Sequence, residues 1–136
     1  MAVVAPSLLR ATGTYNFDFR LSAAARGLAI TSRITAKGAG AATLTQTLQF
    51  YDEASGFFIP LTDSTAAAPV AVSQTPGIAV AASDNFRLVV YPSFGQPAPA
   101  QGKNMFFSAA VPSSLRLVCV VAVDTITFSV GAKSLY

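Results

Sequence analysis

The most constraining feature of the sequence is a regular alternation of apolar and polar side chains in its first half. The alternation runs through residues 15–21, 28–37 and 42–51. In the last of these segments, Leu44 and Leu48 share one face and threonines occupy the other. A period of two residues indicates a strand with one buried face. Burial on one side only is typical of antiparallel sheets.

The rest of the chain continues as short apolar runs separated by turn residues. The loop 52–56 predicts a hairpin, because Asp and Ser favour turns and its glycine accepts a positive φ. Residues 38–40 predict another hairpin turn, and Asp124 with Thr125 a third. We expect Gly131 to bend the chain into a tail. Further strands are expected at residues 57–61, 86–91, 105–110, 115–123 and 126–130.

These segments amount to about eight strands, and no segment keeps a helical period. The prediction is an all-β fold, an antiparallel β-sandwich that is jelly-roll-like or immunoglobulin-like. The run 115–123 is apolar at successive positions, which predicts a strand buried on both faces. A length of 136 residues fits one domain. We expect residues 1–13 to form an N-terminal arm and residues 14–136 to form the sandwich.

The composition indicates that part of the surface is covered. Hydrophobic residues make up 52% of the chain and charged residues 11%, against about 25% charged residues in average proteins. A free monomer normally carries more surface charge, so we expect a partner or a second copy to bind. A tightly packed sandwich rich in Ala, Thr and Ser is the alternative. No run is apolar enough for a membrane span, which needs about 20 residues.

The residues needed for catalysis or metal binding are missing. There is no histidine, which excludes Ser-His-Asp and Cys-His catalysis and removes the commonest metal ligand. Only Asp52 and Glu53 are adjacent carboxylates, and neighbours at a strand end point apart, so they make a poor acid–base pair. The single cysteine, Cys119, lies in an apolar run and is expected to pack in the core. We predict a protein that is not an enzyme and needs no cofactor or metal.

The nine basic residues are scattered and form no basic cluster, so nucleic acid is not an expected partner. Arg20, Arg26, Arg33 and Lys37 are candidates for a shared sheet face that meets an acidic protein surface. The alternative is that these charges are spread and serve solubility.

Three stretches carry a resemblance to a known family. They read TLTQTLQFYDEASGFFIPL, FRLVVYPS and VPSSLRLVCVVAVDTITFSVGAKSLY. The last contains Pro112 and Arg116, four residues apart, and ends on the strand FSVGA at 128–132. The order and spacing of these pieces resemble the small β-sandwich head decoration (cement) proteins, or minor capsid proteins, of tailed bacteriophages.

The resemblance implies a structural virion protein made in the host cytoplasm. Such proteins commonly bind the outside of the capsid and cement the major capsid protein, often as homotrimers. It implies no membrane or nucleic-acid partner. The turn 52–56 and the loop 93–104 are the expected contacts. Within them, the predicted contact residues are Asp52, Glu53, Ser55, Phe94, Gln96, Gln101 and Lys103.

Other interpretations stay open at this point. One is a different virion structural role, such as head–tail completion or tail or fibre attachment. Another is a receptor module that binds carbohydrate. The turn and the loop named above are alternatively plain connections between strands.

Overall fold

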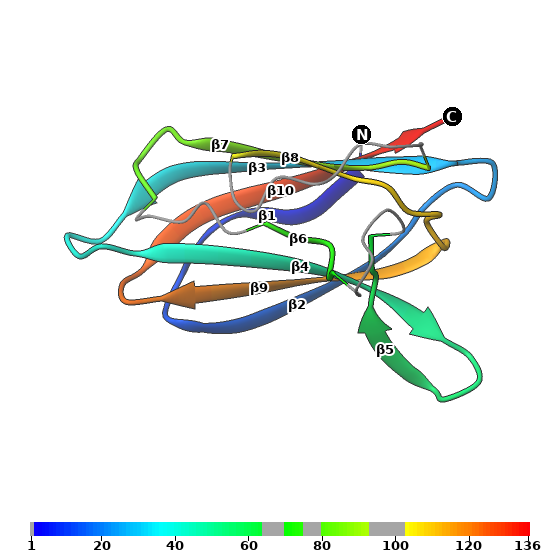
Figure 1. The fold of residues 1–136 in the computed structure, drawn as a ribbon. Helices are drawn as coiled ribbons and strands as arrows, with labels where there is room; N and C mark the ends of the chain where they lie inside the picture. Colours follow the sequence, from blue (N-terminus) through cyan, green and yellow to red (C-terminus); the bar gives the residue numbers. More distant parts are fainter. Residues whose placement is uncertain (1, 64–69, 75–79, 93–102) are drawn as a thin grey trace.

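Figure 1 shows the fold in the computed structural model, which describes residues 2–63, 70–74, 80–92 and 103–136. The described residues form ten strands and no helix, which confirms the predicted all-β class. The first five strands are β1 (Ala2–Arg10), β2 (Gly13–Arg20), β3 (Gly27–Lys37), β4 (Thr43–Asp52) and β5 (Phe57–Pro60). The other five are β6 (Ser73–Gln74), β7 (Asn85–Val90), β8 (Asn104–Phe107), β9 (Ser114–Ala122) and β10 (Ile126–Leu135).

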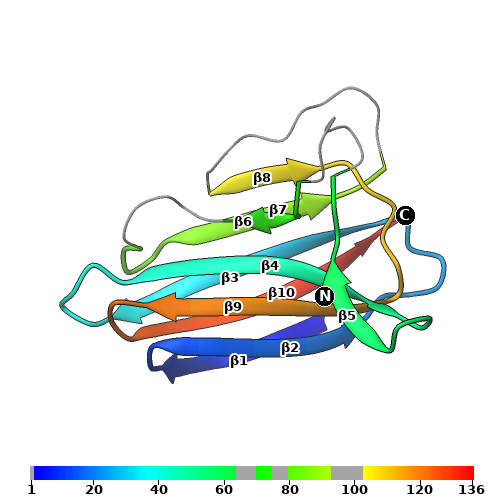
Figure 2. The ribbon, with the colours of Figure 1, turned by 60° about the horizontal axis from the view of Figure 1, so that its bottom comes forward.

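The strands form two sheets that pack face to face (Figure 2). Sheet A has the order β1-β10-β3-β7-β8, and sheet B has the order β2-β9-β4-β5, with β6 also paired to β4. The pairs β1–β10, β2–β9, β3–β7 and β4–β6 are antiparallel and nested in sequence, like one long hairpin. Successive pairs fall in alternate sheets. A hairpin rolled up in this way is a jelly roll, so the sandwich is jelly-roll-like rather than immunoglobulin-like.

The core lies between the two sheets and is filled by alternate positions of the strands. On β9, Leu115, Leu117 and Cys119 are fully buried, which confirms that the cysteine packs as a core residue. Phe86 and Phe128 of sheet A are the largest of the fully buried side chains. The period-two pattern of the sequence is therefore the pattern of burial, as expected for sheets with one dry face.

The first strand departs from the expectation that residues 1–13 are an arm outside the sandwich. β1 pairs with β10 at the edge of sheet A, with register shifts between Val3 and Ala5 and between Ala5 and Leu8. These irregularities interrupt the alternation that marks the other strands. Pro6 also lacks the N–H group that a regular ladder uses. The pattern of side chains therefore could not identify β1.

Three other expectations are wrong. β10 does not bend at Gly131 but continues to Leu135, because its pairing with β3 holds the glycine in an extended ladder. β9 is buried on one face only, and Val120 is 38% exposed on the other, because the outer face of sheet B has no further sheet packed on it among the described strands. The turns at 38–40 and at Asp124 are not hairpins, since each connects strands of different sheets.

Asp124 holds these two crossover turns together. Its carboxylate accepts hydrogen bonds from the N–H groups of Gly40 and Thr125, both at 2.7 Å. The N–H of Gly38 donates to the carbonyl of Thr125 at 2.9 Å. A Cβ at Gly38 would collide with the carboxylate, so the close approach requires glycine. The hydrogen bonds, chiefly that from Gly40, hold the pKa of Asp124 below its ordinary value of 3.8.

A buried polar pair connects the two sheets inside the core. The side-chain amide of Gln46 on β4 donates to the hydroxyl of Ser32 on β3 at 2.7 Å. The same nitrogen lies 3.7 Å from the sulfur of Cys119. Gln46 and Ser32 are each about fully buried, at 1% exposure. A hydrogen bond of this kind fixes how one sheet sits over the other, because unpaired polar groups are costly in an apolar core.

We predict that Asp124→Asn lowers the melting temperature at neutral pH, and that the difference from wild type closes in acid. A carboxyl whose pKa is depressed on folding stabilises the native state above its unfolded pKa and loses that effect as pH falls through the folded pKa. Thermal unfolding followed by circular dichroism from about pH 7 to about pH 2 measures this. A melting-temperature difference that stays constant over this range would contradict the role given to Asp124.

A second prediction concerns the Gln46–Ser32 pair. Ser32→Ala leaves the amide of Gln46 buried without its acceptor and should cost about 1–3 kcal/mol of unfolding free energy. Adding Gln46→Leu removes both polar groups and should restore most of that loss. Urea unfolding of wild type, Ser32→Ala, Gln46→Leu and the double variant completes the comparison. Losses that simply add in the double variant would show that the two side chains do not interact.

Candidate protein-binding surfaces

The β4–β5 hairpin projects from the body of the sandwich (Figure 1). Its turn is held by Asp52, whose carboxylate accepts hydrogen bonds from the N–H groups of Ala54 (3.3 Å) and Ser55 (3.2 Å). The hydroxyl of Ser55 is the main cause of a lowered pKa of Asp52. Gly56 has a φ of 76°, as the sequence predicts. Two of the predicted contact residues, Asp52 and Ser55, thus shape the turn themselves.

Aromatic side chains line this hairpin. The rings of Tyr51 and Phe58 meet edge to face with centroids 5.3 Å apart. The guanidinium of Arg116 on β9 lies 3.9 Å from the centre of the Phe58 ring. The same guanidinium donates to both carboxylate oxygens of Asp18, at 2.6 and 3.1 Å. Phe57 faces away from this cluster and is 70% exposed, so the hairpin carries an apolar tip.

The other predicted contact residues are separated by the fold. Glu53 is exposed in the hairpin turn of sheet B. Lys103 precedes β8 in sheet A, where its ammonium group pairs with Asp84 at 2.9 Å. Phe94, Gln96 and Gln101 lie outside the described residues. The structure therefore does not bring Glu53 and Lys103 together on one sheet.

An apolar edge that the sequence did not single out lies along β1. Val3, Leu8 and Leu9 are 76%, 58% and 62% exposed. The edge belongs to sheet A and lies beside β2, at the opposite side of the sandwich from β5. Large exposed apolar side chains grouped in this way mark contact sites with other proteins. Their sequence signal is the pair of doublets Val3-Val4 and Leu8-Leu9, which are incompatible with one-sided burial in a regular strand.

Arg10 fastens the irregular part of β1 to the sandwich. Its buried guanidinium donates to the carbonyl oxygens of Pro6 (2.9 Å), Leu8 (3.1 Å) and Phe128 (2.7 Å). It also lies over the rings of Phe128 and Phe17, at 4.4 and 5.3 Å from their centres. Burial lowers the pKa of Arg10, but an arginine side chain stays charged in proteins. The contacts keep β1 in place despite its broken ladder.

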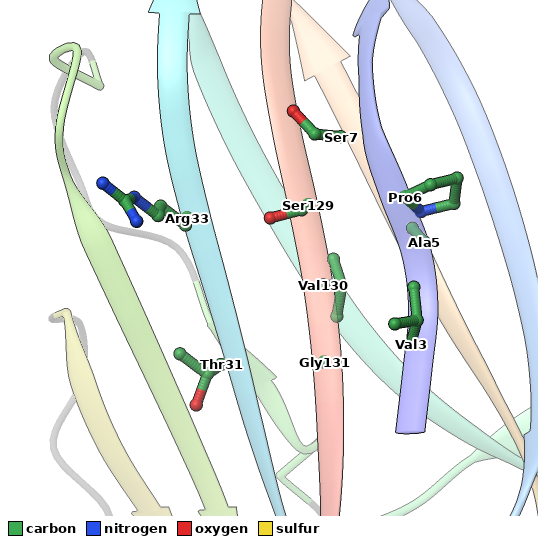
Figure 3. Close-up of a pocket in the computed structure, with 9 residues that line it drawn as sticks. All are labelled: Val3, Ala5, Pro6, Ser7, Thr31, Arg33, Ser129, Val130 and Gly131. Carbon is green, nitrogen blue, oxygen red and sulfur yellow. The ribbon is translucent and has the colours of Figure 1, made fainter. Parts of the chain in front are cut away.

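A groove runs along β10 on the outer face of sheet A. Figure 3 shows Val3 and Pro6 of β1 on one side, Thr31 and Arg33 of β3 on the other, and Ser129, Val130 and Gly131 of β10 along the floor. The groove has a volume of about 410 Å³. Its floor is low because the outward residues of β10 here are small. The β1 side is therefore mostly apolar, with the hydroxyl of Ser7 as its polar group, and the β3 side carries a hydroxyl and a cation.

The outer faces of the two sheets differ in charge. Sheet A presents Arg33, Arg87 and Lys133, all exposed. In sheet B, outward positions of β4 and β9 carry uncharged threonines and valines, with the Asp18–Arg116 pair toward one end. Sheet B thus offers a nearly neutral surface and sheet A a basic one.

The four basic residues expected on one face do not share it. Arg20 belongs to β2 of sheet B, whereas Arg33 projects from β3 of sheet A. The guanidinium of Arg26 lies 5.7 Å from the centre of the Tyr91 ring. The ammonium group of Lys37 donates to the carbonyls of Gly38 and Gly40, both at 3.2 Å. Arg20 and Arg33 are separated because β2 and β3 enter opposite sheets.

The described residues contain no constellation suited to catalysis. No group of three metal-ligating side chains occurs among them. Burial raises the pKa of Cys119 to about 12, so its thiol is protonated and inert. No helix in the described part of the chain is long and apolar enough to cross a membrane.

We predict that Arg10→Met loosens β1 more than the rest of the fold. Charge-assisted hydrogen bonds contribute about 1.5–3 kcal/mol, and the methionine keeps the apolar stem but donates nothing. Amide hydrogen exchange should accelerate in β1 while β4 and β9 keep their protection. Uniform acceleration over all strands, or none in β1, would contradict the fastening role. Arg20→Met, on an exposed position of β2, is the matched control.

No family model matches the chain, and no curated protein matches it. Among solved structures, a chain in the structure of infectious bursal disease virus, Gt strain, is similar with a TM-score of 0.47 and 12% sequence identity. The likeness covers 96% of this chain and 29% of that chain, so the present chain spans under a third of its neighbour's length. At these values the likeness carries no argument about function, and the fold assignment rests on the strand pairing alone.

Proposed function

We propose that the chain is a structural virion protein that binds the outside of a phage capsid and cements its coat subunits. The observation that carries this proposal is the pair of apolar contact sites at opposite sides of one rigid sandwich. One is the β1 edge with Val3, Leu8 and Leu9, and the other is the hairpin tip with Phe57. A molecule that bridges two neighbours needs two such sites held at a fixed separation.

The fold and the chemistry support the same conclusion. Jelly rolls are common in viral capsid and lectin domains and in cupins. A fold alone does not assign a function, so the side chains must decide between these classes. The chain has no histidine, and its cysteine is buried, which leaves binding as the chemistry available to it.

The binding free energy for such a role comes from many weak contacts that act together. Each contact site is small, and a surface patch of a few apolar side chains gives a weak interface on its own. Two sites on one unit raise the local concentration of the second contact once the first has formed, which multiplies the affinity. Binding of many copies then resists the separation of coat subunits. A trimer, which the resemblance to cement proteins implies, would strengthen this effect further.

The test uses capsids of the encoding phage from which this gene has been deleted. Wild-type protein added to these particles should cosediment with them and raise the temperature at which they release DNA. Leu9→Ser and Phe57→Ser, each at an exposed position, should keep the fold but weaken binding about tenfold, as loss of an interface hot spot does. Val123→Ser, which removes a similarly exposed valine outside both contact sites, is the control.

Absence of binding by wild-type protein would overturn the proposal. Imaging of the complete particle adds an independent readout. Density for the sandwich at the head–tail junction, or on a fibre, would replace cementing by one of the other virion roles. Density spread over the coat lattice is the expected result.

A further inference from the structure

The outer face of sheet A is basic without any acidic residue to balance it. Arg33 stands on β3, Arg87 on β7 and Lys133 on β10, and all three are exposed. In the strand register, Thr31 pairs with both Gly131 and Arg87, and Arg33 pairs with Ser129, so these side chains share one face. The outward positions of sheet A in the described strands include no Asp or Glu.

The carboxylates of the chain are committed elsewhere. Asp18 and Asp84 hold Arg116 and Lys103, respectively, in ion pairs. Asp52 and Asp124 bind backbone N–H groups in turns. The remaining two of the six are Glu53, in the hairpin turn of sheet B, and Asp63, which is buried and accepts a hydrogen bond from the Ser108 N–H.

The two arginines lie close together on an exposed face and can bind one anionic group in common. Arg33 is opposite Asn85, and Arg87 is two residues further along β7, so the two are diagonal neighbours. Diagonal positions on one sheet face are roughly 7–8 Å apart, and long side chains bridge that gap. Like charges so close repel each other. Neither guanidinium forms an ion pair with any described residue, and every carboxylate side chain of the sequence is among those residues.

The groove beside Arg33 places a mostly apolar surface next to this cationic pair. Its β1 side is formed by Val3, Ala5, Pro6 and Ser7, whose hydroxyl extends toward β10, and Gly131 on the floor leaves the backbone of β10 open to contact (Figure 3). The guanidinium of Arg33 extends from β3 toward β7, away from that side. A ligand lying across the face would therefore meet apolar surface at β1 and positive charge at β3 and β7.

We propose that this face docks an acidic segment of the coat protein, with carboxylates against Arg33 and Arg87 and an apolar side chain in the groove along β10. The inference rests on the proposed function and names the face and the chemistry by which the sandwich binds. The apolar edge of β1 borders the same face, so its exposed side chains extend the contact. Arginine suits this role because its planar guanidinium binds carboxylates through two parallel hydrogen bonds.

A protein segment fits this face better than nucleic acid does. Proteins that bind single strands stack bases on exposed aromatic rings along a basic channel. The central outward residues around these arginines are Thr31, Ser129 and Asn85, none of them aromatic. Beside them, the described strands of this face offer one outward ring, the half-buried Phe106 of β8, which does not make a row of stacking rings. Three cations on one face are also few beside the six to ten phosphate contacts of typical duplex binders.

The experiment measures binding of wild-type and variant protein to capsids purified from the phage with the gene deleted. Arg33→Glu should weaken binding about tenfold, because it replaces an attraction by a repulsion at the contact. Arg20→Glu makes the same change of charge on exposed β2 of sheet B and should change the affinity less than twofold. Raising the salt concentration should weaken wild-type binding and affect Arg33→Glu less. Unchanged melting temperatures establish that both variants are folded.

The outcomes separate the inference from the proposed function. Wild-type binding that Arg33→Glu leaves intact would overturn the inference and leave the cementing role standing. Failure of the wild type itself to bind would overturn both. Binding of wild-type protein and of Arg33→Glu to a single-stranded thymidine 20-mer is measured as well. If that oligonucleotide binds in an Arg33-dependent way while capsid binding does not depend on Arg33, the face is a nucleic-acid site and the inference is wrong.

Discussion

The pairing of the first strand with the last closes the roll and is the longest-range constraint on its topology. β1 and β10 form the outermost pair of a nested set, and the other pairs lie between them in sequence. Joining segments so far apart carries a large loop-closure cost, which slows folding. The hydrogen-bond ladder between β1 and β10 is also irregular, so its hydrogen bonds alone hold β1 only weakly in the sheet. Arg10 compensates by binding the carbonyl groups of the irregular segment and of β10 at once.

The same rolled connectivity explains why the two faces of the molecule differ. The first four strands enter the two sheets in turn, so neighbouring charges such as Arg20 on β2 and Arg33 on β3 end on opposite outer surfaces. Charges that are distant in sequence, such as Arg33 and Arg87, are brought side by side. Segregation of this kind gives one near-neutral surface and one basic surface from a chain of low charge.

Much of the fold was predictable from the sequence, because burial in a sandwich has the same period as the strand. Leu44 and Leu48 face the core as their spacing requires, and the turn after Asp52 has the geometry that Gly56 permits. The order of strands was not predictable, since alternation says which face is buried but not which strand lies beside it. β1 was not predicted as a strand for a related reason: its register shifts remove the alternation of apolar and polar side chains.

The candidate site was predicted less well than the fold. The sequence drew attention to turns, and Asp52 and Ser55 proved to be occupied in building their own turn. The basic face depends on which strands become neighbours, and no local pattern carries that information. The exposed doublets of β1 were visible in the sequence, but they acquire meaning only when the strand is known to lie at an edge.

The irregular edge of β1 also bears on how copies of this protein meet one another. An open, regular edge strand invites another strand to pair with it, and such pairing repeats without limit into fibres. Pro6 has no N–H group to donate to an added strand. The register shifts on either side of Ala5 also misalign the remaining N–H donors of β1 with the acceptors of a regular strand. At this edge, neighbouring molecules would therefore join through side chains rather than by extending sheet A. The irregularity of β1 thus protects this side of the sandwich from the addition of further strands.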